Sequence, residues 1–168
     1  MYYQECLNQQ NPIIEMNITG YGLLKIELFP KIAPETVKNF LKLVEEGFYN
    51  GLTFHRIISG FMIQGGDPLG TGIGGSGKCI KGEFNRNGFD NPLKHTRGVI
   101  SMARSGLPNS ASSQFFIMHQ DAPHLDGSYA AFGAVIEGMD VVDKIAQTKT
   151  NYEDYPLNKV VIEEVKRV

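Results

Sequence analysis

A single arginine lies between two apolar runs in the stretch from Phe54 to Asp67, FHRIISGFMIQGGD. Phe61, Met62 and Gln64 follow Arg56 within eight positions. Strand side chains alternate between two faces, so two short strands joined by a turn would place Arg56, Phe61 and Gln64 on one face. A fixed cation beside an aromatic ring, a thioether and an amide suits peptide recognition better than hydrolysis. The alternative is a hairpin whose arginine simply extends along an apolar surface to water.

The usual hydrolytic arrangements find no support in the sequence. The four histidines are His55, His95, His119 and His124. None belongs to an H-E-x-x-H pair, which argues against a zinc site, and Ser59 and Ser101 lie in no G-x-S-x-G elbow. Cys6 and Cys79 are not a close-spaced metal or redox pair, so we interpret them as free thiols in a reducing compartment.

A glycine-rich segment, Gly72 to Gly77, matches the dinucleotide fingerprint G-x-G-x-x-G. That fingerprint binds a pyrophosphate only where a helix follows and points its N-terminus at the phosphates. Residues 78–82 show no helical periodicity, so we expect no nucleotide and no other cofactor. The glycines are expected to let a backbone loop lie close to a flat surface.

Composition indicates one soluble domain with no strong electrostatic partner. The chain has 168 residues and a net charge of −2, which argues against nucleic acid or an anionic membrane as a partner. No apolar run approaches the roughly 20 residues of a membrane span, and the first residues lack the pattern of a secretion signal. We therefore expect a cytoplasmic monomer, with a loosely held N-terminal arm at 1–12 and a single domain at 13–168.

Periodicity predicts about eight short strands and two helices. Pro34 begins the clearest helix, 34–46, and a second short helix is expected around 139–146. The predicted strands lie at 13–19, 23–28, two within the stretch from Phe54, then 98–102, 114–118, 130–136 and 159–166, the last with a possible bulge at Glu163-Glu164. Many antiparallel strands with few helices favour a closed eight-stranded antiparallel β-barrel capped by two α-helices, filled by its own side chains. A site would then lie outside the barrel.

Later segments carry more amide and apolar side chains. Gln114 and Phe116 belong to one apolar strand, Ala103-Arg104 lies shortly before it, and Leu125 follows. Each also has a purely structural interpretation, with Phe116 in the core, Gln114 at a strand end and Leu125 filling a loop.

These motifs together resemble those of the cyclophilins, the peptidyl-prolyl cis–trans isomerases. The stretch from Phe54 to Asp67 is similar to the family signature, and the later blocks follow in the family's order. These blocks are Ser101-Met102-Ala103, Ser113 to Ile117, Leu125-Asp126-Gly127 and Phe132-Gly133. The resemblance runs from about Ile14 to the C-terminus and implies an eight-stranded antiparallel barrel capped by two helices.

The resemblance also implies roles for individual residues. Arg56, Phe61 and Gln64 would form the catalytic set, with Arg56 at the twisting amide. The implied substrate-binding residues are His55, Met62, Ala103, Arg104, Gln114, Phe116, His124, Leu125 and Tyr129. The proline ring would lie among Phe61, Met62, Phe116 and Leu125, and the two glutamines would hold the peptide backbone. His55 would be a hydrogen-bonded neighbour of Arg56.

Two positions depart from the best-known eukaryotic pattern. His124 stands where those members carry tryptophan, and Tyr129 stands where they carry histidine. The chain is more similar to compact bacterial members, and cyclosporin-type cyclic peptides are expected to bind with weakened affinity. The expected partners are proline-containing polypeptides, and no metal is expected. The alternative function is a proline-peptide-binding module with little or no turnover.

Overall fold

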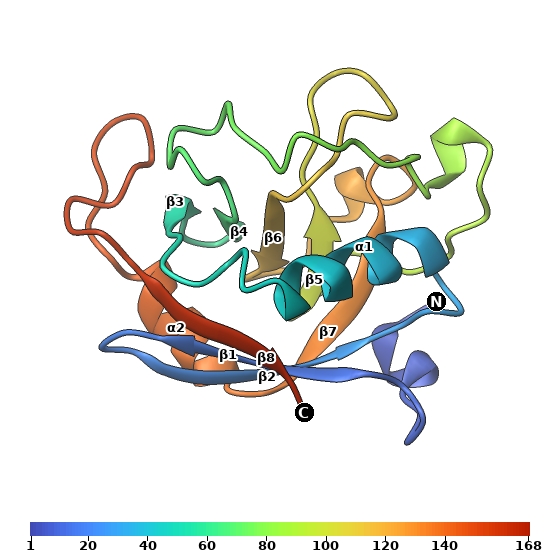
Figure 1. Ribbon diagram of the computed structural model, residues 1–168, viewed down its shortest axis with the longest axis horizontal. Coiled ribbons are helices and arrows are strands. Elements are labelled where there is room, and N and C mark those ends of the chain that lie inside the picture. The colour runs from blue at the N-terminus through green and yellow to red at the C-terminus, as the bar shows by residue number, and fades with distance from the viewer.

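The computed structural model describes residues 1–168 and contains eight strands and two α-helices, the numbers that periodicity predicted. The strands are β1 (Ile13–Ile18), β2 (Gly22–Leu28), β3 (Phe54–Ile58), β4 (Met62–Gly65), β5 (Val99–Met102), β6 (Phe115–Met118), β7 (Ala131–Glu137) and β8 (Ile162–Arg167). The helices are α1 (Pro34–Glu45) and α2 (Met139–Ala146). Figure 1 shows β1, β2 and β8 along the lower side, and the long connections β4–β5 and β5–β6 along the upper side.

All eight strands belong to one antiparallel sheet with the order β3-β4-β6-β5-β7-β2-β1-β8. The sheet curls strongly but stays open, so the prediction of a closed barrel was wrong. β3 and β8 form no continuous ladder. Their ends approach at an isolated bridge between Thr53 and Val161, where the Ile162 N–H donates to the Leu52 carbonyl at 2.7 Å. The connection before β8 takes the outer edge of β3 instead, since the Ile57 N–H donates to the Asp154 carbonyl at 2.9 Å.

The sheet's inner face forms the main core. In β1, Ile14, Met16 and Ile18 point inward, as their alternation predicts, and all are fully buried. β8 carries an irregularity opposite Asn17-Ile18, where the paired partner changes from Glu164 to Ile162. Glu163 is therefore the extra residue of a bulge, which confirms the predicted slip.

Helix α1 packs its apolar stripe into this core. Phe40 is fully buried, with its ring centroid 5.0 Å from that of Tyr49 and 5.7 Å from that of Phe115. Pro34 lies in the first turn, and the buried Glu83 carboxylate accepts the N–H of Thr36 at 2.7 Å, which suits the positive end of the helix dipole. No helix is long and apolar enough to cross a membrane.

The N-terminal arm is fastened rather than loosely held. The Met1 amine donates to the Pro92 carbonyl at 2.9 Å, and the Lys94 N–H donates back to the Met1 carbonyl. The Glu27 carboxylate accepts the Asn8 N–H at 2.9 Å and the Asn11 side-chain amide at 3.0 Å. These bonds attach the arm to the sheet's outer face, where the candidate site also lies.

Candidate active site

The β3–β4 hairpin places Arg56 on the outer face of the sheet. Arg56 pairs with Gln64 across the hairpin, but the register shifts between Phe54 and Arg56, so His55 is an extra residue in β3. Without this bulge, Arg56 would share a face with Phe54, which is fully buried in the inner core. The bulge thus lets Phe54 point inward while Arg56 points outward and is exposed.

Cross-strand pairing brings the other candidates beside Arg56. Gln64 lies opposite Phe116 in the β4–β6 ladder, and Phe116 lies opposite Ser101 in the β5–β6 ladder. Facing residues of neighbouring strands lie within side-chain contact, so Arg56, Gln64 and Phe116 form a row on the outer face. Residues 52 positions apart in the sequence are therefore neighbours.

This row borders a hollow of about 130 Å³. Its lining residues are Arg56, Phe61, Met62, Gln64, Ala103, Arg104, Phe116, Leu125 and Tyr129. Met62, Phe116 and Leu125 are buried and supply an apolar floor, while the exposed Arg56 stands at the edge. Nine of the twelve residues suggested by the sequence therefore share one cavity, which combines an apolar surface with a cation.

A chain of amide hydrogen bonds holds the arginine in place. The Arg56 Nη1 donates to the Gln64 Oε1 at 3.3 Å, and the Gln64 Nε2 donates to the Gln114 Oε1 at 2.9 Å. The Gln114 Nε2 in turn donates to the carbonyls of Gly72 and Gly74, at 3.0 and 2.8 Å. Only one guanidinium N–H is used, so the other donors of Arg56 remain available to a ligand in the hollow.

Asp67, which sequence reasoning did not select, shapes the glycine-rich loop. Its buried carboxylate accepts backbone N–H groups of Leu69, Thr71, Gly72 and Gly74 at 2.6–3.2 Å. Burial alone would raise the pKa of Asp67, but these four donors outweigh it and hold the pKa below its ordinary value. The signal in the sequence was an aspartate directly after two glycines, at the start of a loop rich in backbone donors.

The dinucleotide fingerprint lacks the helix that it would need. The segment from Gly72 to Gly77 is irregular, and the next helical turn is a short 3₁₀ segment at Asn85–Asn87. A Cβ at Gly74 would lie 2.1 Å from the Asp67 Oδ1, so the glycine is required by the carboxylate that organises the loop. The structure also contains no group of three or more side chains that could hold a metal ion.

Comparisons with known proteins identify the family. The model of the family "cyclophilin type peptidyl-prolyl cis-trans isomerase" matches residues 13–167. The chain belongs to this family. It is 52% identical over 131 residues to a peptidyl-prolyl cis-trans isomerase of Helicobacter pylori, covering 77% of each chain. It is 48% identical over 149 residues to peptidyl-prolyl cis-trans isomerase-like 3 of Gallus gallus, covering 88% of this chain and 91% of that protein.

Other relatives are larger proteins, and solved structures share the cyclophilin fold. The chain is 45% identical over 148 residues to peptidyl-prolyl cis-trans isomerase-like 2 of Gibberella zeae, of which it spans only about a quarter (25%) while 88% of this chain is covered. A crystal structure of a cyclophilin-type isomerase from Cryptosporidium parvum superimposes with a TM-score of 0.86 at 35% identity, over 94% of this chain and 98% of that one. A second structure of that protein, in the presence of the dipeptide Ala-Pro, gives 0.85.

Arg104 lines the hollow, but its charged group is held by other parts of the protein. Its guanidinium donates to the Ser128 carbonyl through Nε at 3.1 Å and Nη2 at 2.7 Å. The same group lies over the rings of Phe84 and Tyr129, 4.6 and 4.8 Å from their centroids. These contacts commit the charge within the protein and fix Tyr129 at the edge of the hollow.

Three predicted residues, His55, Gln114 and His124, lie outside the hollow itself. His124 is exposed, and its ring is 5.7 Å from that of Phe61, so it extends the aromatic wall. His55 is buried behind Arg56, and neither of its ring nitrogens has a hydrogen-bond partner, contrary to the expected hydrogen-bonded neighbour. The His55 ring packs against the glycine-rich loop, since a Cβ at Gly72 would lie 3.7 Å from its Nε2. Burial lowers the pKa of His55, so it is neutral at pH 7.

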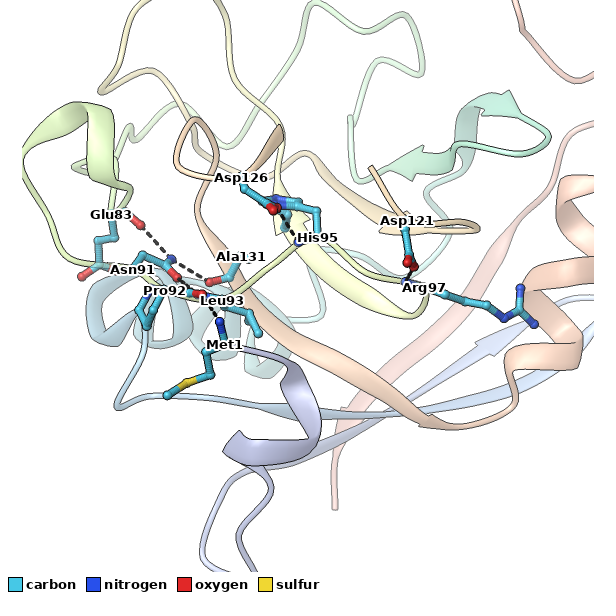
Figure 2. Close-up of polar contacts among 11 residues, drawn as sticks. Met1, Glu83, Asn91, Pro92, Leu93, His95, Arg97, Asp121, Asp126 and Ala131 are labelled. Carbon is cyan, nitrogen blue, oxygen red and sulfur yellow. Dashed lines mark hydrogen bonds and ion pairs between the residues drawn. The ribbon is translucent and has the colours of Figure 1, made fainter. Parts of the chain in front are cut away.

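A hydrogen-bonded triad of His95, Ser101 and Asp126 supports Phe116. The His95 Nε2 is 2.9 Å from the Ser101 Oγ, and its Nδ1 is 3.1 Å from the Asp126 Oδ1. Figure 2 shows His95 beside Asp126. Burial lowers the pKa of His95, against the opposing effect of Asp126, so the ring is neutral. Because Asp126 can only accept, Nδ1 donates to it and Nε2 accepts the Ser101 hydroxyl.

The same three residue types form a nucleophilic triad in hydrolases, but here the serine cannot reach a substrate. Ser101 is fully buried, and the His95 ring stacks on Phe116 at 6.0 Å and 18°. The triad therefore acts as a support for the floor of the hollow. Sequence reasoning missed it because the three residues have no diagnostic spacing.

Proposed function

We propose that the chain catalyses cis–trans exchange of X-Pro bonds in polypeptides and so assists their folding. The observation that carries this proposal is the placement of the Arg56 guanidinium at the edge of an apolar hollow lined by Phe61, Met62, Phe116 and Leu125. The hollow suits a proline ring, and Gln64, which lines it, suits an amide beside that ring. Gln114 lies outside the hollow and acts through its hydrogen bond to Gln64.

Arg56 fits a reaction that breaks no bond. Amide resonance creates the rotational barrier of ~18–20 kcal/mol. Twisting the bond returns a lone pair to the prolyl nitrogen, and a donor aimed at that nitrogen acts only in the twisted state, so it lowers the barrier. Arginine suits this role because it is always charged and holds its donors in a rigid fork.

Arg56 alone cannot supply the acceleration. Uncatalysed exchange takes tens to hundreds of seconds, so turnover in milliseconds needs about 10⁴-fold, or roughly 5.5 kcal/mol. One charge-assisted hydrogen bond contributes about 1.5–3 kcal/mol. The remainder is assigned to the apolar walls, which hold the proline ring while the preceding carbonyl rotates in a partly dry groove.

A protease-coupled assay on a short X-Pro peptide tests the proposal. We expect Arg56→Lys to lower kcat/KM at least about tenfold, because lysine keeps the charge but loses the fork. Arg86→Lys is the matched control, since Arg86 is also exposed but lies outside the hollow. Activity of Arg56→Lys close to wild type would show that Arg56 has another role.

The same assay separates catalysis from the alternative function. A proline-peptide-binding module would bind the peptide, as seen by calorimetry, and would leave the slow isomerisation phase unchanged. The Cryptosporidium parvum relative was crystallised in the presence of Ala-Pro, which supports a proline-containing ligand in either case. The monomeric state, the cytoplasmic location, the 1–12 and 13–168 division and weakened cyclosporin binding stay predictions.

A further inference from the structure

The turn between β3 and β4 carries Phe61, one wall of the hollow, and is fastened to a histidine. The Gly60 N–H donates to the His119 Nδ1 at 2.8 Å. The Phe61 carbonyl accepts the N–H of His119 at 2.9 Å and that of Gln120 at 3.3 Å. Gly60 has φ +80° and lies at the exposed tip of the hairpin, where few other contacts could hold it. Residue 119 therefore binds the turn through both its backbone and its ring.

The ring of His119 is itself fixed on its other side. Its Nε2 is 3.1 Å from the Asp143 Oδ1 of α2, and its side chain is only 14% exposed. Asp143 forms a bidentate ion pair with Arg97, in which both N–O distances are 2.7 Å. Arg97 also donates through its backbone N–H to Asp121 at 2.8 Å, and Figure 2 shows its side chain extending away from that contact.

These contacts define which ring nitrogen of His119 accepts and which donates. Gly60 can only donate, so Nδ1 must be an unprotonated acceptor, and the ring proton lies on Nε2, facing Asp143. The Arg97 guanidinium, through its hydrogen bonds and charge, holds the pKa of Asp143 below its usual range, so this acceptor stays ionised. The charged groups around the ring are Asp143 from α2, Arg97 from the segment before β5, and Asp121, which lies two residues after His119 on the same segment. The β3–β4 turn supplies none.

We propose that His119 is a positioning residue of the isomerase site, which holds the Gly60–Phe61 turn through an unprotonated Nδ1. The inference rests on the proposed function, because it gives Phe61 the task of holding the proline ring. A proton on Nδ1 removes the acceptor of the Gly60 N–H, whereas the bond from Nε2 to Asp143 persists. Protonation of His119 therefore releases one side of the turn that carries Phe61.

Two substitutions separate the two ring nitrogens. Asparagine places its amide oxygen near the position of Nδ1 and does not titrate. His119→Asn therefore keeps an acceptor for the Gly60 N–H and loses the hydrogen bond to Asp143. Glutamine reaches the position of Nε2, so His119→Gln keeps the hydrogen bond to Asp143 and loses the acceptor for the Gly60 N–H. We expect kcat/KM to fall about tenfold in His119→Gln, the effect of one hydrogen bond, and to stay within about threefold of wild type in His119→Asn. Gln120→Ala is the control, since Gln120 contributes only its backbone N–H.

The chemical shift of the Gly60 amide, measured by NMR, reports the hydrogen bond to Nδ1. It would not follow the protonation of His119 if the ring only packed against the turn. In the wild type the Gly60 amide proton should shift upfield as acid protonates His119, with the same midpoint as the imidazole carbons. In His119→Asn this shift should be absent. The inference would be overturned if the chemical shift of the Gly60 amide did not change while His119 is protonated. Equal losses of activity in the asparagine and glutamine variants would overturn it too. An inactive wild type would instead overturn the proposed function, while the Gly60 amide still reports the bond to Nδ1.

Discussion

Replacement of Asp67 by asparagine should destabilise the protein strongly, although the two side chains have nearly the same shape. The Oδ2 accepts three N–H groups, from Thr71, Gly72 and Gly74, and the Oδ1 accepts that of Leu69. An asparagine can place its oxygen toward the three donors, but its NH₂ then faces the fourth. Loss of charge weakens the three remaining bonds by about 0.5–1 kcal/mol each, and the opposed donors add roughly 1–3 kcal/mol.

After some relaxation of the loop, we expect Asp67→Asn to cost about 3–4 kcal/mol of unfolding free energy, measured in urea at pH 7. At about 2–4 °C per kcal/mol for a chain of this size, Tm should fall by roughly 10 °C. Asp90→Asn is the matched control, because Asp90 is exposed and makes no hydrogen bond or ion pair. It should change stability by less than about 0.5 kcal/mol.

The pH dependence of this difference has a definite sign. The folded pKa of Asp67 lies below its ordinary value, so the unfolded chain takes up the proton first as pH falls. The stabilisation by Asp67 is complete above the unfolded pKa of about 4 and is lost as pH falls through the folded pKa. The gap between wild type and Asp67→Asn should therefore close in acid. A gap below about 1 kcal/mol at pH 7, or one that widens in acid, would refute this account of the loop.

Two further predictions concern the helix cap and the aromatic wall. Glu83→Gln should cost about 1–2 kcal/mol, because the buried carboxylate accepts the Thr36 N–H at the start of α1, and hydrogen exchange should accelerate first in that helix. Exchange that accelerates equally throughout the protein would contradict this local role. His124→Trp should raise cyclosporin affinity at least about tenfold by calorimetry, since indole restores an N–H and a large apolar face beside Phe61. Unchanged affinity would show that the exposed position 124 does not contact the cyclic peptide.

Alternation and helix signals were sufficient to predict most of the fold. The alternation of Ile14, Met16 and Ile18 predicted the inner face of β1. Pro34 predicted the residue at which α1 begins. Closure of the sheet could not be predicted, because it depends on which segment occupies the edge of β3. That edge is taken partly by Asp154, from a connection without periodicity.

The candidate site, like the fold, was predictable from the sequence only in part. Arg56, Phe61, Met62 and Gln64 are close in sequence, and a local pattern was enough to place them on one face. The supports behind them are long-range contacts: His95 reaches Asp126, 31 residues away, and Asp143 reaches Arg97, 46 residues away. Neither pair has a spacing that strands or helices produce, so only the folded chain reveals them.

The floor of the hollow and its Phe61 wall are both supported from the segment that leads into β5. His95 supports Phe116 through ring stacking, and Arg97 supports Phe61 through Asp143 and His119. Figure 2 shows both residues on this one segment. A rotation that breaks no bond gains nothing from a nucleophile or a metal, and it depends on holding a small ring still while its neighbour turns. Histidines that support the lining of the hollow from outside it are consistent with that requirement.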